Sequence, residues 1–196
     1  VPVPEGRFCT TAILAEQAAE TLGFPLVLKG LGHAHKSEAG AVHLNLWSSQ
    51  AVAQAAADMD SDGYLLEQMV SDGVAEVLVA VLRDPAHGFV LTIGAGGVMT
   101  EILMDVATRL VPATAQDVRA ALTELRLYPV LRGYRGSPGI NIDALIQAVL
   151  GVQGFVLETA AHLEEVEINP LICTPDRAVA VDALITMGVS NDRDTD

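Results

Sequence analysis

The order of strand and helix patterns along the chain limits its fold more than any other feature. The strand patterns span residues 26–29, 42–46, 64–68, 75–82, 89–93, 101–110, 166–173 and 178–186. The helical patterns span residues 12–22, a segment after Ser48, 115–125 and 143–161. Because the two kinds of element do not alternate regularly, we expect an α+β fold with antiparallel sheet rather than a doubly wound parallel one.

Charge and composition exclude several classes of function. The chain of 196 residues carries 11 Lys plus Arg against 25 Asp plus Glu, a formal net charge of −14, so nucleic acid is not an expected partner. No apolar run approaches the roughly 20 residues of a membrane helix, and the first residues do not form a signal segment. We therefore expect a cytoplasmic protein without a membrane partner, with a disordered tail at 190–196.

The two cysteines and the opening residues give two further expectations. Cys9 and Cys173 are far apart in the sequence and lack the spacing of a zinc site, so they are expected to be buried, inert thiols. The chain opens Val-Pro-Val-Pro without a methionine, which suggests that it belongs to a longer polypeptide.

The only two lysines, Lys29 and Lys36, lie in one short segment with His33 and His35. Lysine is otherwise replaced by arginine, so these two residues are candidates for point charges on phosphates or carboxylates. Chance in a lysine-poor sequence is the alternative. A zinc site of His33, His35 and His43 is not expected, because no cysteine lies nearby.

The last two predicted strands bring oxygen donors together. Residues two apart on a strand face the same way, so Glu167 and Asn169 share a face. A hairpin centred between Pro175 and Asp176 places Asn169 opposite Asp182, with Cβ atoms roughly 5 Å apart. Such oxygens suit Mg²⁺, which takes one or two carboxylates and keeps water and phosphate ligands. A solvated acidic strand face is the alternative.

Four weaker candidates lie elsewhere in the chain. Glu67 and Glu76 end and begin strands on either side of a connection, where carboxylates can bind ribose hydroxyls or an adenine amino group, or serve no function. Residues 94–97, Gly-Ala-Gly-Gly, offer backbone N–H groups to an anion but match no phosphate-loop spacing. Arg135 between two glycines can meet a phosphate or form an ordinary surface turn.

Taken in order, these segments carry a family pattern. The set resembles the ATP-grasp domain of NDP-forming acyl-CoA synthetases, which include the β subunit of ADP-forming acetyl-CoA synthetase and, more distantly, succinyl-CoA synthetase. The segments that carry the resemblance are 23–29 (GFPLVLK), 35–40 (HKSEAG), 66–68 (LEQ), 84–85 (DP) with Gly88, 94–97 (GAGG), 105–110 (DVATRL), 133–136 (GYRG) and 167–170 (EINP).

The resemblance implies an ATP-grasp fold over 1–189, in which two α+β subdomains clasp a nucleotide and the crossover lies near 67–73. It implies the reaction of an acid, CoA and ATP to acyl-CoA, ADP and phosphate through phosphohistidine. His35 would relay the phosphoryl group as a nucleophile. The implied nucleotide-binding residues are Lys29, Glu67, Val70, Glu76 and Arg135, and the implied Mg²⁺ ligands are Glu167, Asn169 and Asp182. Glu167 can instead orient the phosphohistidine.

The chain departs from the family pattern in three places. Residues 31–34 replace a longer segment with a Ser-Pro pair, Ala41 replaces a glycine, and Leu184 stands where arginine is common. The resemblance also implies a separate or fused CoA-binding ligase module, without which this chain binds ATP or ADP but makes no thioester. A non-catalytic nucleotide sensor fused to an acetyltransferase is the alternative function.

Overall fold

The computed structural model describes residues 1–32, 41–97 and 100–188. These residues form two compact units, Pro4–Ser71 and Val1–Val3 together with the residues from Asp72 onward. The expected tail at 190–196 lies outside the described residues, and no helix within the described ranges is long and apolar enough to cross a membrane.

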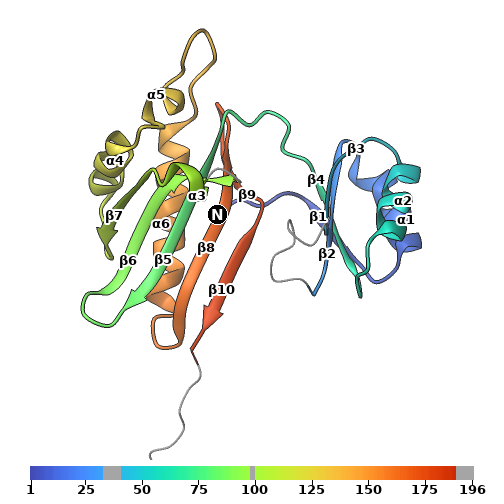
Figure 1. Cartoon of the computed structure of the whole chain (residues 1–196), viewed down its shortest axis with the longest axis horizontal. Coiled ribbons are helices and arrows are strands. Elements are labelled where there is room, and N and C mark those ends of the chain that lie inside the picture. Colours follow the sequence, from blue (N-terminus) through green and yellow to red (C-terminus); the bar gives the residue numbers. More distant parts are fainter. Residues whose placement is uncertain (33–40, 98–99, 189–196) are drawn as a thin grey trace, which may run out of the picture. The chain divides into compact units, whose positions relative to one another are not determined.

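The smaller unit is a four-stranded antiparallel sheet with two helices on one face (Figure 1). Its elements are β1 (Gly6–Cys9), α1 (Ala12–Leu22), β2 (Leu26–Gly30), β3 (Val42–Leu46), α2 (Ser49–Asp58) and β4 (Tyr64–Gln68), with the strands ordered β1-β4-β2-β3. Ala15, Ala19 and Ala55 let the helices approach Leu28 and Leu66 closely, which closes the core of this unit.

Local capping chemistry fixes both helices where the sequence predicts them. The Thr11 side chain accepts the Leu14 N–H, and the Ser48 side chain accepts the Ala51 N–H. Gly23 ends α1 at φ 77°, a conformation that favours glycine, and donates its N–H to Ala19 O. The predicted helices 12–22 and after Ser48 are therefore confirmed.

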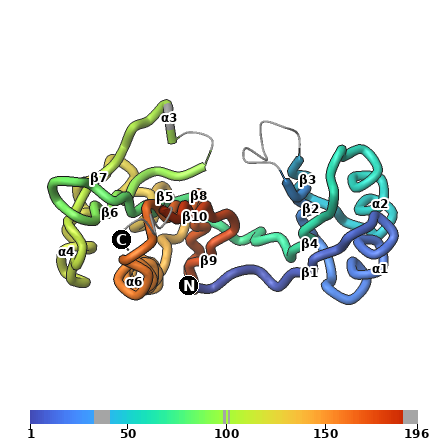
Figure 2. The backbone as a smooth tube through the Cα atoms, turned by 90° about the horizontal axis from the view of Figure 1, so that it is seen from below, coloured from blue at the N-terminus to red at the C-terminus, as the bar shows by residue number. Residues whose placement is uncertain are grey.

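The larger unit is an antiparallel sheet in the order β10-β8-β5-β6-β7, with β9 paired to β8. Helices α4 and α6 pack on one face of it (Figure 2) and share one core with Val77, Val79 and Leu91. The elements are β5 (Ala75–Asp84), β6 (Gly88–Ala95), α3 (Thr100–Leu103), β7 (Val106–Leu110), α4 (Ala115–Glu124), α5 (Tyr128–Leu131), α6 (Ile142–Glu158), β8 (Leu163–Cys173), β9 (Ala178–Ala180) and β10 (Ala183–Met187). Together the two antiparallel sheets with their helices confirm the predicted α+β class.

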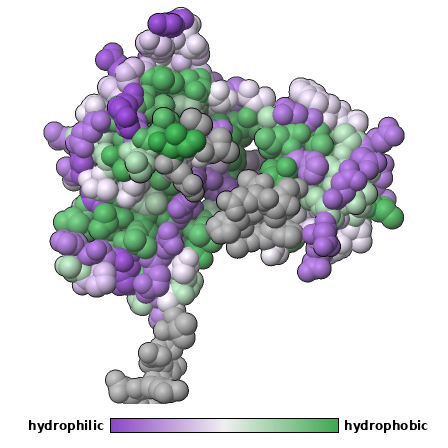
Figure 3. All heavy atoms as spheres, viewed as in Figure 1, coloured by the Kyte–Doolittle hydropathy of each residue, from purple (hydrophilic) through white to green (hydrophobic). Residues whose placement is uncertain are grey.

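Much of the surface is apolar, because the chain has few charged residues. The face drawn in Figure 3 shows apolar patches between polar ones. Strand β10 lies at the edge of its sheet, and all five of its residues are exposed, including Leu184, Ile185 and Met187.

The hairpin register agrees with the prediction, whereas the second strand does not. Asn169 donates its backbone N–H to Asp182 O at 3.2 Å, so these two residues lie opposite each other. The expected strand 178–186 is wrong, because it divides into β9 and β10 around residues 181–182. Strand β8 is irregular at the same place: Val77 pairs with Leu171 but Val79 pairs with Ile168, so an extra residue forms a bulge at 169–170.

Two further expectations are wrong in detail. Residues 101–110 were predicted as one strand, but α3 and a turn precede β7. The turn is held by Asp105, a buried carboxylate that accepts the Arg126 and Leu127 N–H groups at 2.8 Å each. The predicted connection 128–139 begins with the helix α5, which Pro129 favours in its first turn.

Candidate functional site

Lys29 and Glu67 form a buried ion pair in the smaller unit. Lys29 lies opposite Leu65, and Val27 lies opposite Glu67, so the two charged residues are diagonal neighbours on β2 and β4. Their Nζ and Oε2 atoms are 2.5 Å apart, and each side chain is 10% exposed. Because Leu28 and Leu66 face the helices, the ion pair lies on the sheet face without helices.

Glu67 Oε2 meets the lysine at ion-pair distance but makes no hydrogen bond of good geometry among the described residues. Burying such an ion pair costs the desolvation of both charges, a cost that a functional role can justify. This pair is therefore a candidate for contact with a polar ligand.

A second candidate site lies in the larger unit, where β8 bulges. The side-chain oxygen Asn169 Oδ1 accepts the Gly97 N–H at 2.8 Å, and Asp182 Oδ1 accepts the Ala183 N–H at 3.1 Å. Glu167, two residues before Asn169, lies opposite Ala80 and Leu184 on the neighbouring strands. Thus the middle of β8 carries two of the three predicted oxygen donors, and the third, Asp182, lies opposite Asn169 between β9 and β10.

The glycine loop after β6 joins Glu76 to this second site. Gly96 donates its N–H to Glu76 O at 2.9 Å, and a Cβ atom on Gly97 would collide with the Glu76 carboxylate. The structure therefore places Glu76, Gly97 and Asn169 next to one another. The sequence did not predict the contact between Gly97 and Asn169. The only signal for this contact in the sequence is the Gly-Ala-Gly-Gly run.

The donor chemistry at the bulge of β8 fits a hard cation. No group of three or more His, Cys, Asp or Glu that could hold a metal occurs in the described part of the chain. The candidate set is instead an amide, Asn169, with the carboxylates Asp182 and Glu167. A carbonyl oxygen has two lone pairs, so Asn169 Oδ1 keeps one after accepting the Gly97 N–H. This composition suits Mg²⁺ with water and phosphate as further ligands.

The remaining predicted residues lie on other segments of the chain or outside the described ranges. Arg135 is exposed, with φ 50°, and its guanidinium stacks on Tyr134 at 5.3 Å from the ring centroid. Val70 is half-buried in the connection between β4 and β5. His35 lies among the residues that the structure does not describe, together with His33 and Lys36.

The cysteines are buried, as predicted. Burial raises the pKa of the Cys173 thiol to about 12 and also raises the pKa of Cys9. Both thiols therefore stay protonated at neutral pH and are poor nucleophiles.

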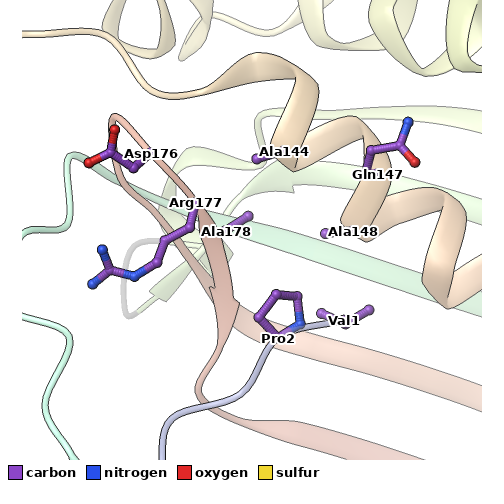
Figure 4. A pocket seen from close by; sticks show the side chains of 8 residues that line it. All are labelled: Val1, Pro2, Ala144, Gln147, Ala148, Asp176, Arg177 and Ala178. Atoms are coloured by element: carbon purple, nitrogen blue, oxygen red, sulfur yellow. The ribbon is translucent and has the colours of Figure 1, made fainter.

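Two hollows on the larger unit contain none of the predicted metal or nucleotide residues. One is lined by Tyr128, Pro129, Arg132 and Gly133. The other, in Figure 4, lies between the first residues, α6 and the β8–β9 turn. Its Arg177 is already paired with the two Asp72 oxygens at 2.8 and 2.9 Å, so this hollow offers a ligand no unpaired guanidinium.

Comparison with known proteins agrees with this architecture. A family model described as an ATP-grasp domain matches residues 1–187. The subunit beta of acetate–CoA ligase (ADP-forming) I from Pyrococcus furiosus is 33% identical over 93% of this chain and 84% of its own length. Acetate–CoA ligase (ADP-forming) II from Archaeoglobus fulgidus is 33% identical over 92% of this chain but only 27% of its own length.

A solved structure shares the fold over nearly the whole chain. It is the dinucleotide forming acetyl-coenzyme A synthetase 1 of Ca. Korarchaeum cryptofilum in complex with coenzyme A and Mg-AMPPCP, with its phosphohistidine segment pointing towards the nucleotide binding site. The TM-score is 0.82 at 30% identity, over 95% of this chain and 85% of that one. The resemblance seen in the sequence is thereby confirmed, and the chain belongs to the ATP-grasp domain family, as a homologue of the β subunits of ADP-forming acetyl-CoA synthetases.

Proposed function

We propose that this chain is the nucleotide-binding and phosphoryl-relay part of an ADP-forming acyl-CoA synthetase. The overall reaction converts an acid, CoA and ATP into acyl-CoA, ADP and phosphate. The observation that carries the proposal is the pairing of Asn169 with Asp182 at the bulge of β8, beside Gly97 and Glu76. This pairing supports a metal–nucleotide site because it brings oxygen donors from two segments of the chain next to each other.

Lys29 is the proposed partner of the nucleotide phosphates. Its ion pair with Glu67 holds the ammonium in place on β2. An ammonium meets a phosphate as a compact point charge. Glu67, Val70 and Glu76 are proposed to contact the adenosine end, and Arg135 is proposed to contact a phosphate.

Glu167, Asn169 and Asp182 are the proposed residues for Mg²⁺. When bound, Mg²⁺ supplies charge that neutralises the phosphate oxygens during transfer. The protein supplies the orientation of the donors: Asn169 is held by the Gly97 N–H, and Asp182 by the Ala183 N–H. Glu167 has a second possible role, which is to orient a phosphohistidine by accepting its ring N–H.

His35 is the proposed phosphoryl acceptor. Its neutral imidazole attacks the γ-phosphorus in line, an N–P bond forms, and the P–O bond to ADP breaks as ADP leaves with the electron pair. The phosphoryl group then passes between His35 and a histidine of the partner module. The phosphohistidine segment in the Korarchaeum synthetase supports this step.

A CoA-binding ligase module is the proposed partner. The Pyrococcus relative is a subunit beta, and the Archaeoglobus relative is more than three times longer than the matched region, so this module is a separate subunit or part of the same polypeptide. The cytoplasmic location expected from the sequence is part of the same proposal.

Calorimetric titration of ADP into the full chain tests the nucleotide site. We expect ADP to bind more tightly with Mg²⁺ than without it, and adenosine to bind weakly in both conditions. Equal affinities for ADP and adenosine, with no effect of Mg²⁺, would contradict the proposed site.

A further inference from the structure

The loop after β6 crosses over β5 to reach β8. In the sheet, β5 lies between β6 and β8, so the loop has to pass over the β5 backbone. Gly96 lies on that backbone: a Cβ atom there would come within 2.6 Å of Val77 C and 2.9 Å of Leu78 N. Gly97 then reaches the far strand and donates its N–H to Asn169 Oδ1 at 2.8 Å.

Gly97 has a backbone conformation that favours glycine, and it lies against the end of the exposed Glu76 side chain. Its φ is 72°, in the left-handed region that side-chain-bearing residues rarely adopt. A Cβ atom there would also occupy the position of the Glu76 carboxylate. The far side of the residue is anchored as well, because Thr100 donates its hydroxyl to Gly97 O at 2.7 Å. Gly97 is therefore anchored through both its N–H and its C=O.

We propose that Gly97 is a positioning residue for the metal–nucleotide site: its N–H fixes the Asn169 carboxamide, and its missing side chain leaves room for the Glu76 carboxylate. The proposal rests on the function assigned above to Asn169 and Glu76. A carboxamide can rotate by half a turn and exchange its oxygen for its NH₂ group. The donated N–H selects the orientation in which oxygen stays at this end of the side chain, with one lone pair left for a cation.

This role predicts a specific defect for Gly97→Ala. Alanine at a φ of 72° relieves its strain by leaving the left-handed region, which turns the N–H away from Asn169. In the full chain with ADP present, we expect the dissociation constant of Mn²⁺, followed by electron paramagnetic resonance, to rise roughly tenfold, the effect of one lost hydrogen bond.

Gly88→Ala is the matched control. Gly88 is the first residue of β6, directly after the β5–β6 turn, at φ 81° with open space around it, so alanine brings the same backbone strain without reaching Asn169 or Glu76. We expect Mn²⁺ affinity to change less than about twofold in this variant. Thr100→Val provides a milder change in the same loop, and we expect a rise of about two- to threefold because only the Gly97 carbonyl anchor is lost.

A double-mutant cycle separates positioning from general loss of structure. If Gly97 acts through Asn169, then Gly97→Ala adds less than about twofold to the Mn²⁺ defect of Asn169→Ala. Two outcomes would overturn the positioning role and leave the proposed function intact. One is that the losses of Mn²⁺ affinity are fully additive. The other is that Gly97→Ala and Thr100→Val keep their Mn²⁺ affinity while Asn169→Ala binds weakly. Unchanged Mn²⁺ affinity in Asn169→Ala would overturn the metal site itself.

Discussion

Lys29 Nζ lies 2.5 Å from Glu67 Oε2, and both side chains are buried on the sheet face without helices. Removing one partner of such a pair leaves the other charge buried and uncompensated. We expect Lys29→Met to lower the free energy of unfolding of the smaller unit by about 3–5 kcal/mol. Chemical denaturation followed by circular dichroism measures this loss.

The double variant Lys29→Met/Glu67→Leu separates stability from binding. It removes both charges, so we expect most of the lost stability to return, because a buried ion pair can be replaced by apolar residues at little net cost. The double variant should still bind ADP about 1–3 kcal/mol more weakly than the parent protein, because it lacks the charge-assisted hydrogen bond from Lys29. Arg7→Met, at an exposed cation on β1, is the control and should bind ADP normally. Recovery of ADP affinity in the double variant would show that Lys29 is only structural.

Asp182→Ala is expected to abolish the effect of Mg²⁺ on ADP binding. The residue lies between β9 and β10, and its bond to the Asn169 N–H uses the backbone oxygen, which alanine keeps, so the fold should survive the substitution. Asp176→Ala changes an exposed carboxylate in the same hairpin and should leave the Mg²⁺ effect unchanged. Calorimetry of ADP with and without Mg²⁺ measures both variants, and an Asp182→Ala protein that keeps the full Mg²⁺ effect would sink the assignment.

Gln153 on α6 holds the segment before α4 with a pair of hydrogen bonds. Its Oε1 accepts the Ala113 N–H at 2.6 Å, and its Nε2 donates to Ala113 O at 3.1 Å, both buried. Gln153→Leu leaves two buried backbone groups without partners, so the larger unit should lose roughly 2–4 kcal/mol in denaturant unfolding. Gln147→Leu, at an exposed position of the same helix, should change stability by less than about 0.5 kcal/mol. Similar losses in the two variants would contradict this role.

The capping box of α4 makes stability depend on pH. Hydrogen bonds from the Thr114 hydroxyl and backbone N–H lower the pKa of Asp117 below its ordinary value of 3.8. A carboxylate with a lowered pKa stabilises the folded state above its unfolded pKa, and this contribution disappears as the pH falls through the folded value. Asp117→Asn should therefore be less stable than the parent protein near pH 7, and the two proteins should be equally stable at a pH well below 3.8. Asp176→Asn is the control and should show no such pH-dependent difference. Denaturant midpoints across this range test the difference.

Local signals in the sequence predicted much of the fold. Thr11, Ser48 and Thr114 cap helices with side chains that bond to residues three positions later, so the capping information lies within one turn. The register that places Asn169 opposite Asp182 depends only on where a short loop is centred.

Features that depend on residues far apart in the chain could not be predicted from the sequence. Strand β1 was not predicted, because Gly6–Cys9 is too short to show a pattern and becomes a strand by pairing with β4. The bulge at 169–170 and the division of 178–186 reflect the pairing of β8 with β5 as well as with the hairpin. The bond from Gly97 to Asn169 joins segments 72 residues apart.

The functional roles assigned to individual residues remain predictions. These residues are Lys29, Glu67, Val70, Glu76, Arg135, the metal ligands and His35. The structure brings Lys29 to Glu67 in the smaller unit, and Asn169 to Gly97 and Asp182 in the larger one.

Phosphorylation of His35 tests the central claim most directly. The full protein is incubated with its CoA-binding module, ATP and Mg²⁺, and phosphopeptides are identified by mass spectrometry under conditions that preserve phosphohistidine. His33→Asn and His43→Asn are controls for the neighbouring histidines, and we expect both to retain phosphate on His35. Acid-labile phosphate on His35 is the result that the phosphoryl relay predicts; phosphate on His33 or His43 instead, or none on His35 while acyl-CoA is still formed, would contradict it.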